Sequence, residues 1–194
     1  MDLVFATNNK NKLYEVSKLI TSGVRLLSLA DIGCAEELPE TQDTLEGNAL
    51  QKARYVFDRY GYNCFADDTG LEIDALGGRP GVFSARYAGE DKNAEANMDK
   101  VLKEMKHETN RNARFRTVIA LVIGGSEYVF EGVVDGTILK EKKGEKGFGY
   151  DPVFSPVSAS GRSFAQMSTE EKNQVSHRGA AVRKLVGYIN SRLT

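Results

Sequence analysis

Residues 63–70 read Asn63-Cys64-Phe65-Ala66-Asp67-Asp68-Thr69-Gly70, an apolar stretch that runs directly into two acids. A short apolar run bounded by polar residues is typical of a buried strand, so we expect a strand over 63–66. Asp67-Asp68-Thr69-Gly70 favours a turn, because aspartate and glycine both stabilise turn conformations. Neighbouring residues that leave a strand point to opposite sides. Only one of the two aspartates should therefore face a given cleft.

Segments on both sides of this stretch show strand or helix patterns. Residues 3–6 form an apolar run typical of a buried strand, and Gly124-Gly125 is a favourable hairpin turn between two further strand patterns. Other segments repeat apolar residues at helical spacing. The expected strands are 3–6, 25–29, 113–123 and 128–134, and the expected helices are 11–20, 44–60, 94–105, a short helix capped by Ser168 and a final helix containing 182–189. Mixed helices and strands with an antiparallel hairpin predict an α/β fold with a mixed sheet.

Capping residues predict where the first two helices begin and end. Asp43, with Glu46 three residues later, forms a capping-box pattern, so Asp43 is expected to cap the second helix. Glycine favours the C-terminal ends of helices. Gly23 and Gly61 are therefore expected to end the first and second helices. Residues 152–154 are expected to be extended.

Length, charge and cysteine content exclude several classes of protein. The chain of 194 residues fits a single domain, 1–194, which can be built as two lobes. Its net charge of -1 provides no general basic field for a nucleic-acid polymer, so a nucleotide would have to be met by a local cluster of lysine and arginine. Cys34 and Cys64 lack a disulfide framework or metal spacing, and the N-terminus lacks signal-peptide or membrane-anchor features. We expect a cytoplasmic protein without a membrane segment.

Thr7-Asn8-Asn9-Lys10-Asn11-Lys12 connects a predicted strand to a predicted helix. The N-terminus of a helix presents unpaired N–H groups and a partial positive charge, both of which favour phosphate. Lys10 and Lys12 add full positive charges, and the threonine and asparagine side chains add donors. The glycine pattern of a Walker loop is absent. Taken alone, the segment is explained more simply as a solvated polar turn.

Acidic residues gather in two segments. Glu36, Glu37 and Glu40 share one loop, and Asp67 and Asp68 follow a predicted strand. Mg²⁺ prefers carboxylate oxygens together with substrate phosphates and water, and one carboxylate from each segment could supply such a site. A carboxylate could also act as a general base toward an attacking water. A pair of exposed turn acids is the alternative.

Two later segments carry groups that suit a nucleobase. In Gly147-Phe148-Gly149-Tyr150-Asp151-Pro152 the glycines allow a close approach, the Phe148 ring offers a stacking face and Asp151 offers an acceptor. Ser176-His177-Arg178-Gly179, expected just before the final helix, offers donors for carbonyl oxygens. A glycine turn with packed aromatic rings and an incidental histidine are the alternatives. No Ser/His/Asp or Cys/His set supports a covalent mechanism.

Six motifs follow one another along nearly the whole chain, from Phe5 to about Leu185. They are Thr-Asn-Asn-x-x-Lys, Glu-Gly-Asn-Ala-x-x-Lys-Ala, Ala-Asp-Asp-Thr-Gly-Leu, Gly-Gly-x-Pro-Gly-Val-x-Ser-Ala-Arg, Gly-Phe-Gly-Tyr-Asp-Pro-x-Phe and Ser-His-Arg-Gly. With this set the sequence resembles the inosine triphosphate pyrophosphatase family, and within it the bacterial dITP/XTP pyrophosphatase branch. The resemblance implies an elongated mixed β-sheet with helices forming two lobes around a central cleft, usually in a homodimer. It also implies Mg²⁺-dependent hydrolysis of ITP, dITP and XTP to the monophosphate and pyrophosphate, which removes deaminated purines from the nucleotide pool.

The resemblance further implies roles for individual residues of this chain. Asp68 would be the catalytic proton acceptor and would hold Mg²⁺ together with Glu40, although Glu36 and Glu37 in the same loop remain alternatives to Glu40. The implied substrate-binding residues are Thr7, Asn8, Asn9, Lys10, Asn11, Lys12, Lys52, Thr69, Phe148, Gly149, Tyr150, Asp151, Lys172, His177 and Arg178.

Base selectivity has a physical interpretation, and two other functions stay open. A 6-oxo purine presents an acceptor at O6 and a donor at N1, which His177 or Arg178 and Asp151 could match, whereas adenine reverses both polarities. Guanine shares this edge, so its exclusion must depend on its 2-amino group, and the sequence does not identify the residue responsible. The other functions are a phosphohydrolase that releases orthophosphate and a nucleotide-binding module without catalysis.

Overall fold

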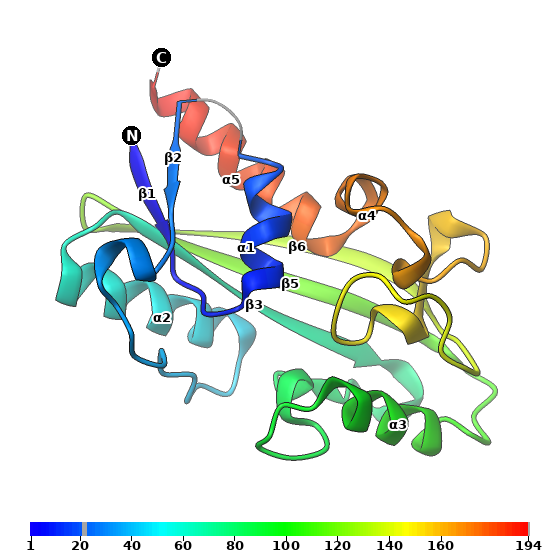
Figure 1. Ribbon diagram of the computed structural model, residues 1–194. Coiled ribbons are helices and arrows are strands. Elements are labelled where there is room, and N and C mark those ends of the chain that lie inside the picture. The colour runs from blue at the N-terminus through cyan, green and yellow to red at the C-terminus, as the bar shows by residue number, and fades with distance from the viewer. Residues whose placement is uncertain (21–22, 194) are drawn as a thin grey trace. The chain divides into compact units, whose positions relative to one another are not determined.

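The computed structural model describes residues 1–20 and 23–193 and shows a mixed α/β fold (Figure 1). The strands are β1 (Asp2–Phe5), β2 (Arg25–Leu27), β3 (Cys64–Ile73), β4 (Pro80–Gly81), β5 (Asn112–Ile123), β6 (Ser126–Ile138) and β7 (Phe154–Pro156). They form one sheet in the order β2-β1-β3-β5-β6-β7, with β4 paired to β3. β1 pairs in parallel with β2 and β3, whereas the β3–β4 and β6–β7 pairs are antiparallel. The predicted α/β class with a mixed sheet is confirmed.

The α-helices of the described residues match the predicted ones in number and in approximate position. They are α1 (Lys10–Ser17), α2 (Leu45–Tyr60), α3 (Ala94–Glu104), α4 (Thr169–Val175) and α5 (His177–Leu193). Ser168 caps α4 in a complete capping box with Glu171, as the sequence predicts. None of the helices in these residues combines the length and the apolar character needed to cross a membrane.

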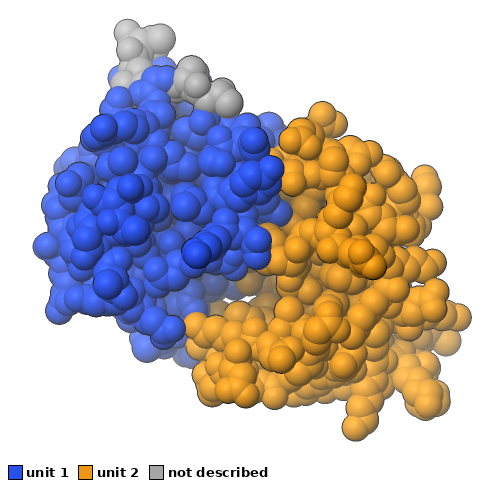
Figure 2. All heavy atoms as spheres, in the orientation of Figure 1, with its two compact units in different colours: residues 1–68, 117–132, 178–194 blue, residues 69–116, 133–177 orange. Residues whose placement is uncertain are grey.

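The chain divides into two compact units (Figure 2). Unit 1 comprises Met1–Asp68, Thr117–Gly132 and Arg178–Thr194, and unit 2 comprises Thr69–Arg116 and Val133–His177. Strands β3, β5 and β6 each contribute residues to both units. Two of the boundaries fall within predicted site motifs, because Asp68 is separated from Thr69 and His177 from Arg178.

The core of unit 1 forms on both faces of its strands. Phe5 of β1 and Phe65 of β3 stack with ring centroids 4.5 Å apart, and they pack with apolar residues of α1 and α5 on one face. Cys64, the neighbour of Phe65, points the other way and donates its thiol to the carbonyl oxygen of Ala53 in α2, at 3.1 Å. Figure 1 accordingly shows α1 and α5 on one side of these strands and α2 on the other. Cys34 and Cys64 are both free, buried thiols.

The core of unit 2 is built around aromatic and aliphatic residues of β3, β5, β7 and α3. Its buried members include Leu71, Ile73, Met98, Val101, Phe115, Phe154 and Phe164. Backbone contact between β3 and β4 requires a glycine at position 70, because a Cβ atom there would lie 2.7 Å from the carbonyl oxygen of Gly81. The glycine that follows the two aspartates therefore serves strand packing.

The clearest difference from the sequence prediction lies at residues 67–70. They were expected to form a turn, yet β3 continues through them as a single strand of ten residues. Asp67 and Asp68 are both buried, and buried strand neighbours override the local preference of aspartate for turns. The two acids therefore stand in the interior of a strand, where alternation fixes their directions.

Several element boundaries also differ from expectation. α1 ends at Ser17, before Gly23, because the backbone tightens when the N–H groups of Leu19 and Ile20 both donate to the carbonyl oxygen of Val16. α5 begins at His177, so that residues 177–179 belong to the helix instead of preceding it, and Ser176 is the C-cap of α4. Residues 151–153 form a 3-10 turn, and the extended segment β7 follows it.

The N-cap of α2 is Thr44 and not Asp43. The Thr44 backbone is extended, and its hydroxyl accepts the N–H of Gly47 at 3.0 Å. Gly61 ends the helix with φ +71°, as predicted.

Replacing the observed cap should cost more stability than replacing the expected one. We predict that Thr44→Ala lowers the free energy of unfolding by about 1 kcal/mol, because an N–H at the start of α2 loses its acceptor. Asp43→Ala is the matched control and should change stability by less than half of that amount. Urea unfolding followed by circular dichroism measures both, and a larger loss in Asp43→Ala would contradict the assignment.

Candidate active site

The two aspartates of β3 point to opposite faces of the unit 1 sheet. Asp67 follows Phe65 by two residues and shares its face, which α1 and α5 cover. Asp68 follows Cys64 and Ala66 on the face that α2 covers. This is the period-two alternation of a strand. The prediction that the two acids point to different sides is confirmed.

Asp67 lies between two cations, the half-buried Lys12 and the buried Arg178. Its Oδ1 accepts Lys12 Nζ at 2.9 Å, and its Oδ2 accepts Arg178 Nε at 3.1 Å. Arg178 also donates through Nη1 to Glu15 of α1 at 2.7 Å. Asp67 and Arg178 are almost fully buried. The four side chains form a charge network that joins β3, α1 and α5, and a buried ion must be paired in this way to be tolerated.

Burial and neighbouring charges both shift the pKa values of this network. Burial is the largest influence on Asp67 and by itself raises the pKa, but Lys12, Arg178 and Lys52 outweigh it and hold the pKa of Asp67 below its usual range. Burial is also the largest influence on Lys12, and it lowers the pKa of that lysine although Asp67 opposes the change. Asp67 is therefore an ionised structural acid whose charge is matched by its neighbours.

Asp68 faces a different set of groups. Its Oδ2 accepts the amide of Asn48 at 3.0 Å, and its Oδ1 lies 3.8 Å from Lys52 Nζ. Lys52 also donates to Glu40 Oε1 at 2.6 Å and to the main-chain oxygen of Asp67 at 2.8 Å. Burial is the largest influence on Asp68 and raises its pKa; Lys52 and Lys12 oppose the shift, and the charge of Glu40 adds to it. Two carboxylates from different segments thus converge on one ammonium group.

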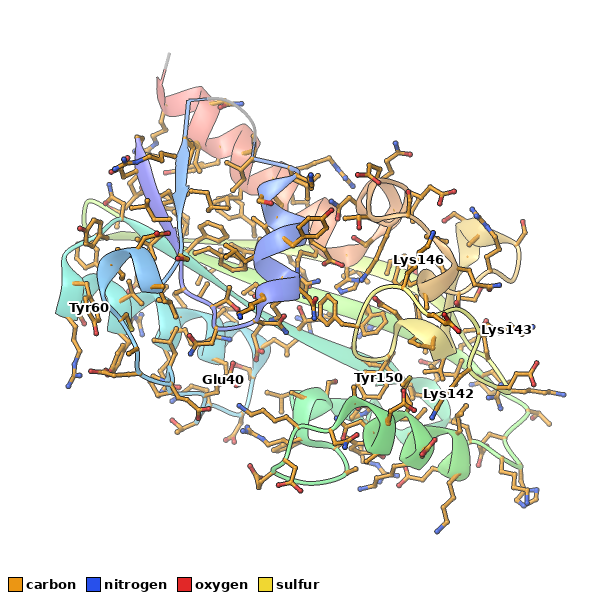
Figure 3. All side chains as sticks on the ribbon, in the orientation of Figure 1. Glu40, Tyr60, Lys142, Lys143, Lys146 and Tyr150 are labelled. Atoms are coloured by element: carbon orange, nitrogen blue, oxygen red, sulfur yellow. The ribbon has the colours of Figure 1, made fainter. Side chains whose placement is uncertain are left out.

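The loop that carries Glu40 is fastened to α2. The side-chain oxygen of Asn48 accepts the N–H of Gln42 at 2.9 Å, while its amide orients Asp68. Gln51 exchanges two hydrogen bonds with Thr41, at 2.9 and 2.8 Å. These contacts hold Glu40 in place ahead of α2, where Figure 3 labels it. Because the positions of Glu40 and Asp68 are both set by Asn48, the pair is preorganised.

Sequence reasoning missed the roles of Asn48, Gln51 and Glu15. Asn48 stands in the Glu-Gly-Asn-Ala motif, and Gly47 beside it has a packing reason: a Cβ atom there would lie 2.7 Å from Gln42 Cβ. The motif could have indicated a helix pressed closely against a loop. Glu15 follows Lys12 by three residues and therefore shares its helix face, which could have indicated a charge pair in α1.

The three glutamates of the acidic loop have different surroundings. Glu36 contacts the Tyr55 hydroxyl and accepts from Arg59 at 3.1 Å on an exposed part of α2. Glu40 contacts Lys52 beside Asp68. Glu37 is exposed. Of the three glutamates, Glu40 thus has the position that a shared site with Asp68 requires, and its role as a metal ligand stays a prediction.

The loop of residues 7–12 is only partly available to a ligand. Asn9 is the N-cap of α1, and its side-chain oxygen accepts the N–H groups of Asn11 and Lys12 at 3.0 and 3.2 Å. Thr7 is half-buried and its hydroxyl accepts the N–H of Asn9, whereas Lys10 is exposed. Asn8 donates to the main-chain oxygen of Glu36 at 3.2 Å and so links this loop to the acidic one. Asn9 thus satisfies part of the free N–H groups at the start of α1. The full positive charges of this loop are those of Lys10 and Lys12.

In unit 2, three of the predicted base-binding residues lie together. Asp151 Oδ2 accepts the N–H of Phe148 at 2.9 Å and Lys172 Nζ at 2.6 Å. The Lys172 ammonium lies 4.7 Å from the centre of the Phe148 ring. Gly147 permits this arrangement, because it has φ +76° and a Cβ atom there would lie 2.0 Å from the Asp151 carboxylate. A half-buried aromatic ring thus lies beside a buried, ion-paired lysine.

Other predicted residues of unit 2 have separate partners. Tyr150 is buried, and its hydroxyl donates to the Ser84 carbonyl oxygen at 2.7 Å, so its ring packs in the core. His177 is also buried and stacks on Phe115 with centroids 4.6 Å apart. Thr69 is half-buried in β3, and Gly149 has φ +61° in the loop after Phe148. The loop itself is fastened to α3 by Lys142, labelled in Figure 3, which contacts Glu95 and Asp99 at 2.6 and 2.7 Å.

The protein should lose different amounts of stability when each of the two strand acids is replaced by its amide. We predict that Asp67→Asn lowers the free energy of unfolding by about 3 kcal/mol or more, because it leaves the buried Arg178 and the half-buried Lys12 without a full counter-charge. Asp68→Asn should cost clearly less, because a raised pKa means that the fold disfavours the charge of Asp68. Chemical denaturation of both variants tests this order, and an equal or larger loss in Asp68→Asn would refute it.

The chain is similar to known proteins over nearly its whole length. The profile of the Ham1 family matches residues 3–188. A protein of Flavobacterium psychrophilum named dITP/XTP pyrophosphatase is 54% identical, over 98% of this chain and 100% of its own length. A Bacillus subtilis protein of the same name is 46% identical, over 95% of this chain and 94% of its own.

Solved structures extend the match to the fold. The Ham1 protein of Staphylococcus aureus has a TM-score of 0.89 and 36% identity, and the match covers 99% of this chain and 100% of that one. A structure from Mycobacterium abscessus, titled nucleoside-triphosphatase and dITP/XTP pyrophosphatase, has a TM-score of 0.76 and 42% identity, covering 95% and 98% of the two chains. This chain belongs to the Ham1 family.

Proposed function

We propose that this protein is a nucleoside-triphosphate pyrophosphatase that hydrolyses the non-standard purine nucleotides ITP, dITP and XTP to the monophosphate and pyrophosphate. The observation that carries the proposal is the convergence of Glu40 and Asp68 on the buried ammonium of Lys52. The names of the relatives support the substrate class, since those with 44–54% identity are called dITP/XTP pyrophosphatases. Such an enzyme removes deaminated purines from the nucleotide pool.

We propose Mg²⁺ as the cofactor, held by Glu40 and Asp68. The donor set suits a hard cation, because both groups are carboxylates and the point on which they converge is taken by a positive charge. Among the described residues, no group of three or more His, Cys, Asp or Glu side chains could hold a metal. Two carboxylates are enough for Mg²⁺ when substrate phosphates and water complete its shell. The bound ion would neutralise triphosphate charge and polarise the phosphoryl oxygens.

The cationic side chains of unit 1 supply the rest of the charge that a triphosphate needs. Lys10 is exposed at the start of α1, Lys12 follows it by two residues, and Lys52 lies beside Glu40 and Asp68. Cleavage between the α and β phosphorus atoms is promoted by positioning and by neutralising negative charge. We assign these lysines, with Thr7 and the asparagines of residues 8–11, to the triphosphate.

Asp68 is the residue that we assign to the attacking water. Asn48 fixes its Oδ2 by donating to it, which sets the plane of the carboxylate. The raised pKa of Asp68 makes it a better proton acceptor than a solvent-exposed aspartate. Asp67 does not qualify, because both of its oxygens accept from Lys12 and Arg178 and its pKa is lowered.

The residues of unit 2 are assigned to the base. Phe148 provides a stacking face, His177 is a predicted donor to O6 of a 6-oxo purine, and we assign Lys172 to the same atom. Arg178, the alternative donor in the prediction, belongs to unit 1 and is paired there with Asp67 and Glu15. Lys172 is held by Asp151, which gives that aspartate a positioning role besides its predicted role as acceptor. A purine of the wrong polarity leaves buried groups unsatisfied at roughly 1–3 kcal/mol each. Two such mismatches correspond to discrimination between the two purines of about a hundredfold or more.

We further propose that residues 1–194 act as one functional domain and that the protein works as a cytoplasmic homodimer. Free thiols at Cys34 and Cys64 agree with a reducing compartment. Light scattering of the purified protein measures the oligomeric state directly.

A panel of nucleoside triphosphates tests the proposed activity. With Mg²⁺ we expect dITP, ITP and XTP to be hydrolysed at least about a hundredfold more efficiently than dATP, since adenine mismatches two polar groups. Orthophosphate should appear only after inorganic pyrophosphatase is added, which separates this activity from a phosphohydrolase. Asp68→Asn is the control and should stay folded but lose nearly all turnover. Equal rates on ATP, GTP and ITP would refute the substrate class, and binding without hydrolysis would indicate a module without catalysis.

Removing the lysine of the base-binding group should reduce discrimination between bases. We predict that Lys172→Met lowers kcat/KM for dITP by about tenfold and lowers the ratio of dITP to dATP hydrolysis, because a donor to O6 is lost. Lys146→Met, an exposed lysine of the preceding loop, is the matched control and should behave like the unmodified protein. An unchanged dITP to dATP ratio in Lys172→Met would remove this lysine from base recognition.

A further inference from the structure

Lys52 stands between the two carboxylates that the proposed function assigns to Mg²⁺. Its Nζ lies 2.6 Å from Glu40 Oε1 and 3.8 Å from Asp68 Oδ1. Only 6% of its side chain is exposed. The ammonium therefore takes up the position between two acids that a small cation would also prefer.

The main chain of β3 also holds the Lys52 ammonium in this position. Lys52 extends from the buried face of α2, and its ammonium also donates to the main-chain oxygen of Asp67, at 2.8 Å. Two carboxylates and a carbonyl oxygen thus surround the ammonium, and this is a set of partners that suits a positive charge. A buried charged lysine needs such partners, and these acids in turn need a cation.

We propose that Lys52 is a built-in counter-ion that holds Glu40 and Asp68 together in the metal-free protein and is displaced from them when the divalent cation binds. This inference rests on the proposed metal site. Displacement frees an ammonium beside the metal, where it can contact a phosphate oxygen of the substrate. Lys52 is in this sense a positioning residue for the metal ligands before it is a substrate contact.

A counter-ion and a purely structural lysine at position 52 would affect metal binding in opposite ways. A positive charge a few ångströms from the metal opposes its binding, and its removal should strengthen the binding of the metal alone. A lysine that only supports the fold of the site would give the opposite result, because its loss would scatter Glu40 and Asp68 and weaken binding. Metal affinity without nucleotide therefore separates the two roles.

The experiment measures the binding of Mn²⁺ alone, by the electron paramagnetic resonance signal of the free ion. We expect Lys52→Met to bind Mn²⁺ about tenfold more tightly than the unmodified protein, or better, given the strength of charge interactions at this separation. Lys52→Arg keeps the charge and should not gain affinity. Lys103→Met removes an exposed lysine of α3 in unit 2 and should leave the affinity unchanged.

The possible results separate this inference from the proposed function. Equal or weaker Mn²⁺ binding by folded Lys52→Met would overturn the counter-ion role and leave the pyrophosphatase proposal standing. If neither protein bound Mn²⁺ at one site, the metal site itself would be refuted, and the counter-ion role with it.

A measurement on the unmodified protein covers the case in which Lys52→Met does not fold. The Nζ resonance of Lys52, assigned by its absence in Lys52→Arg, can be followed by ¹⁵N nuclear magnetic resonance during a titration with Mg²⁺. We expect the resonance to shift and its protons to exchange faster with water as the contact with Glu40 is lost. A resonance that stays unchanged at saturating Mg²⁺ would contradict the displacement.

Discussion

Along β3, consecutive side chains point to opposite faces of the sheet, and the site of unit 1 depends on this alternation at Asp67 and Asp68. One acid enters the face covered by α1 and α5, where Lys12 and Arg178 neutralise it. The other enters the face covered by α2, where Asn48 and Lys52 meet it. Two adjacent, chemically identical residues thus acquire opposite pKa shifts and different tasks.

A strand is a better support for this division than a turn. The directions of its side chains are fixed by backbone hydrogen bonds and by buried neighbours, so Asp68 cannot exchange places with Asp67 without breaking the sheet. Helix α2 further fixes the positions of Asp68 and Glu40, because its Asn48 contacts both Asp68 and the loop that carries Glu40. The cations Lys12 and Lys52 already have carboxylate partners, so in the proposed function the binding of metal and triphosphate would exchange partners among charged groups that are already in place.

Much of this arrangement could be predicted from the sequence, and the errors have identifiable causes. Apolar periodicity gave the helices and most strands, and Gly61 and Ser168 marked helix ends correctly. Local propensity failed at Asp67–Gly70, because burial on both faces outweighs the preference of aspartate for turns. Long-range pairs could not be predicted: nothing local reveals that Arg178 meets Asp67 across 111 residues, or that Tyr150 and His177 face core partners.

A crystal structure with Mg²⁺ and a dITP analogue, in which a methylene group replaces the oxygen between the α and β phosphorus atoms, tests the division between the two aspartates most directly. Our account predicts that Glu40 and Asp68 ligate the metal, that Lys52 has left Glu40 for a phosphate oxygen, and that Asp67 still contacts Lys12 and Arg178. A metal bound by Asp67, or an Asp68 remote from both metal and phosphate, would contradict it.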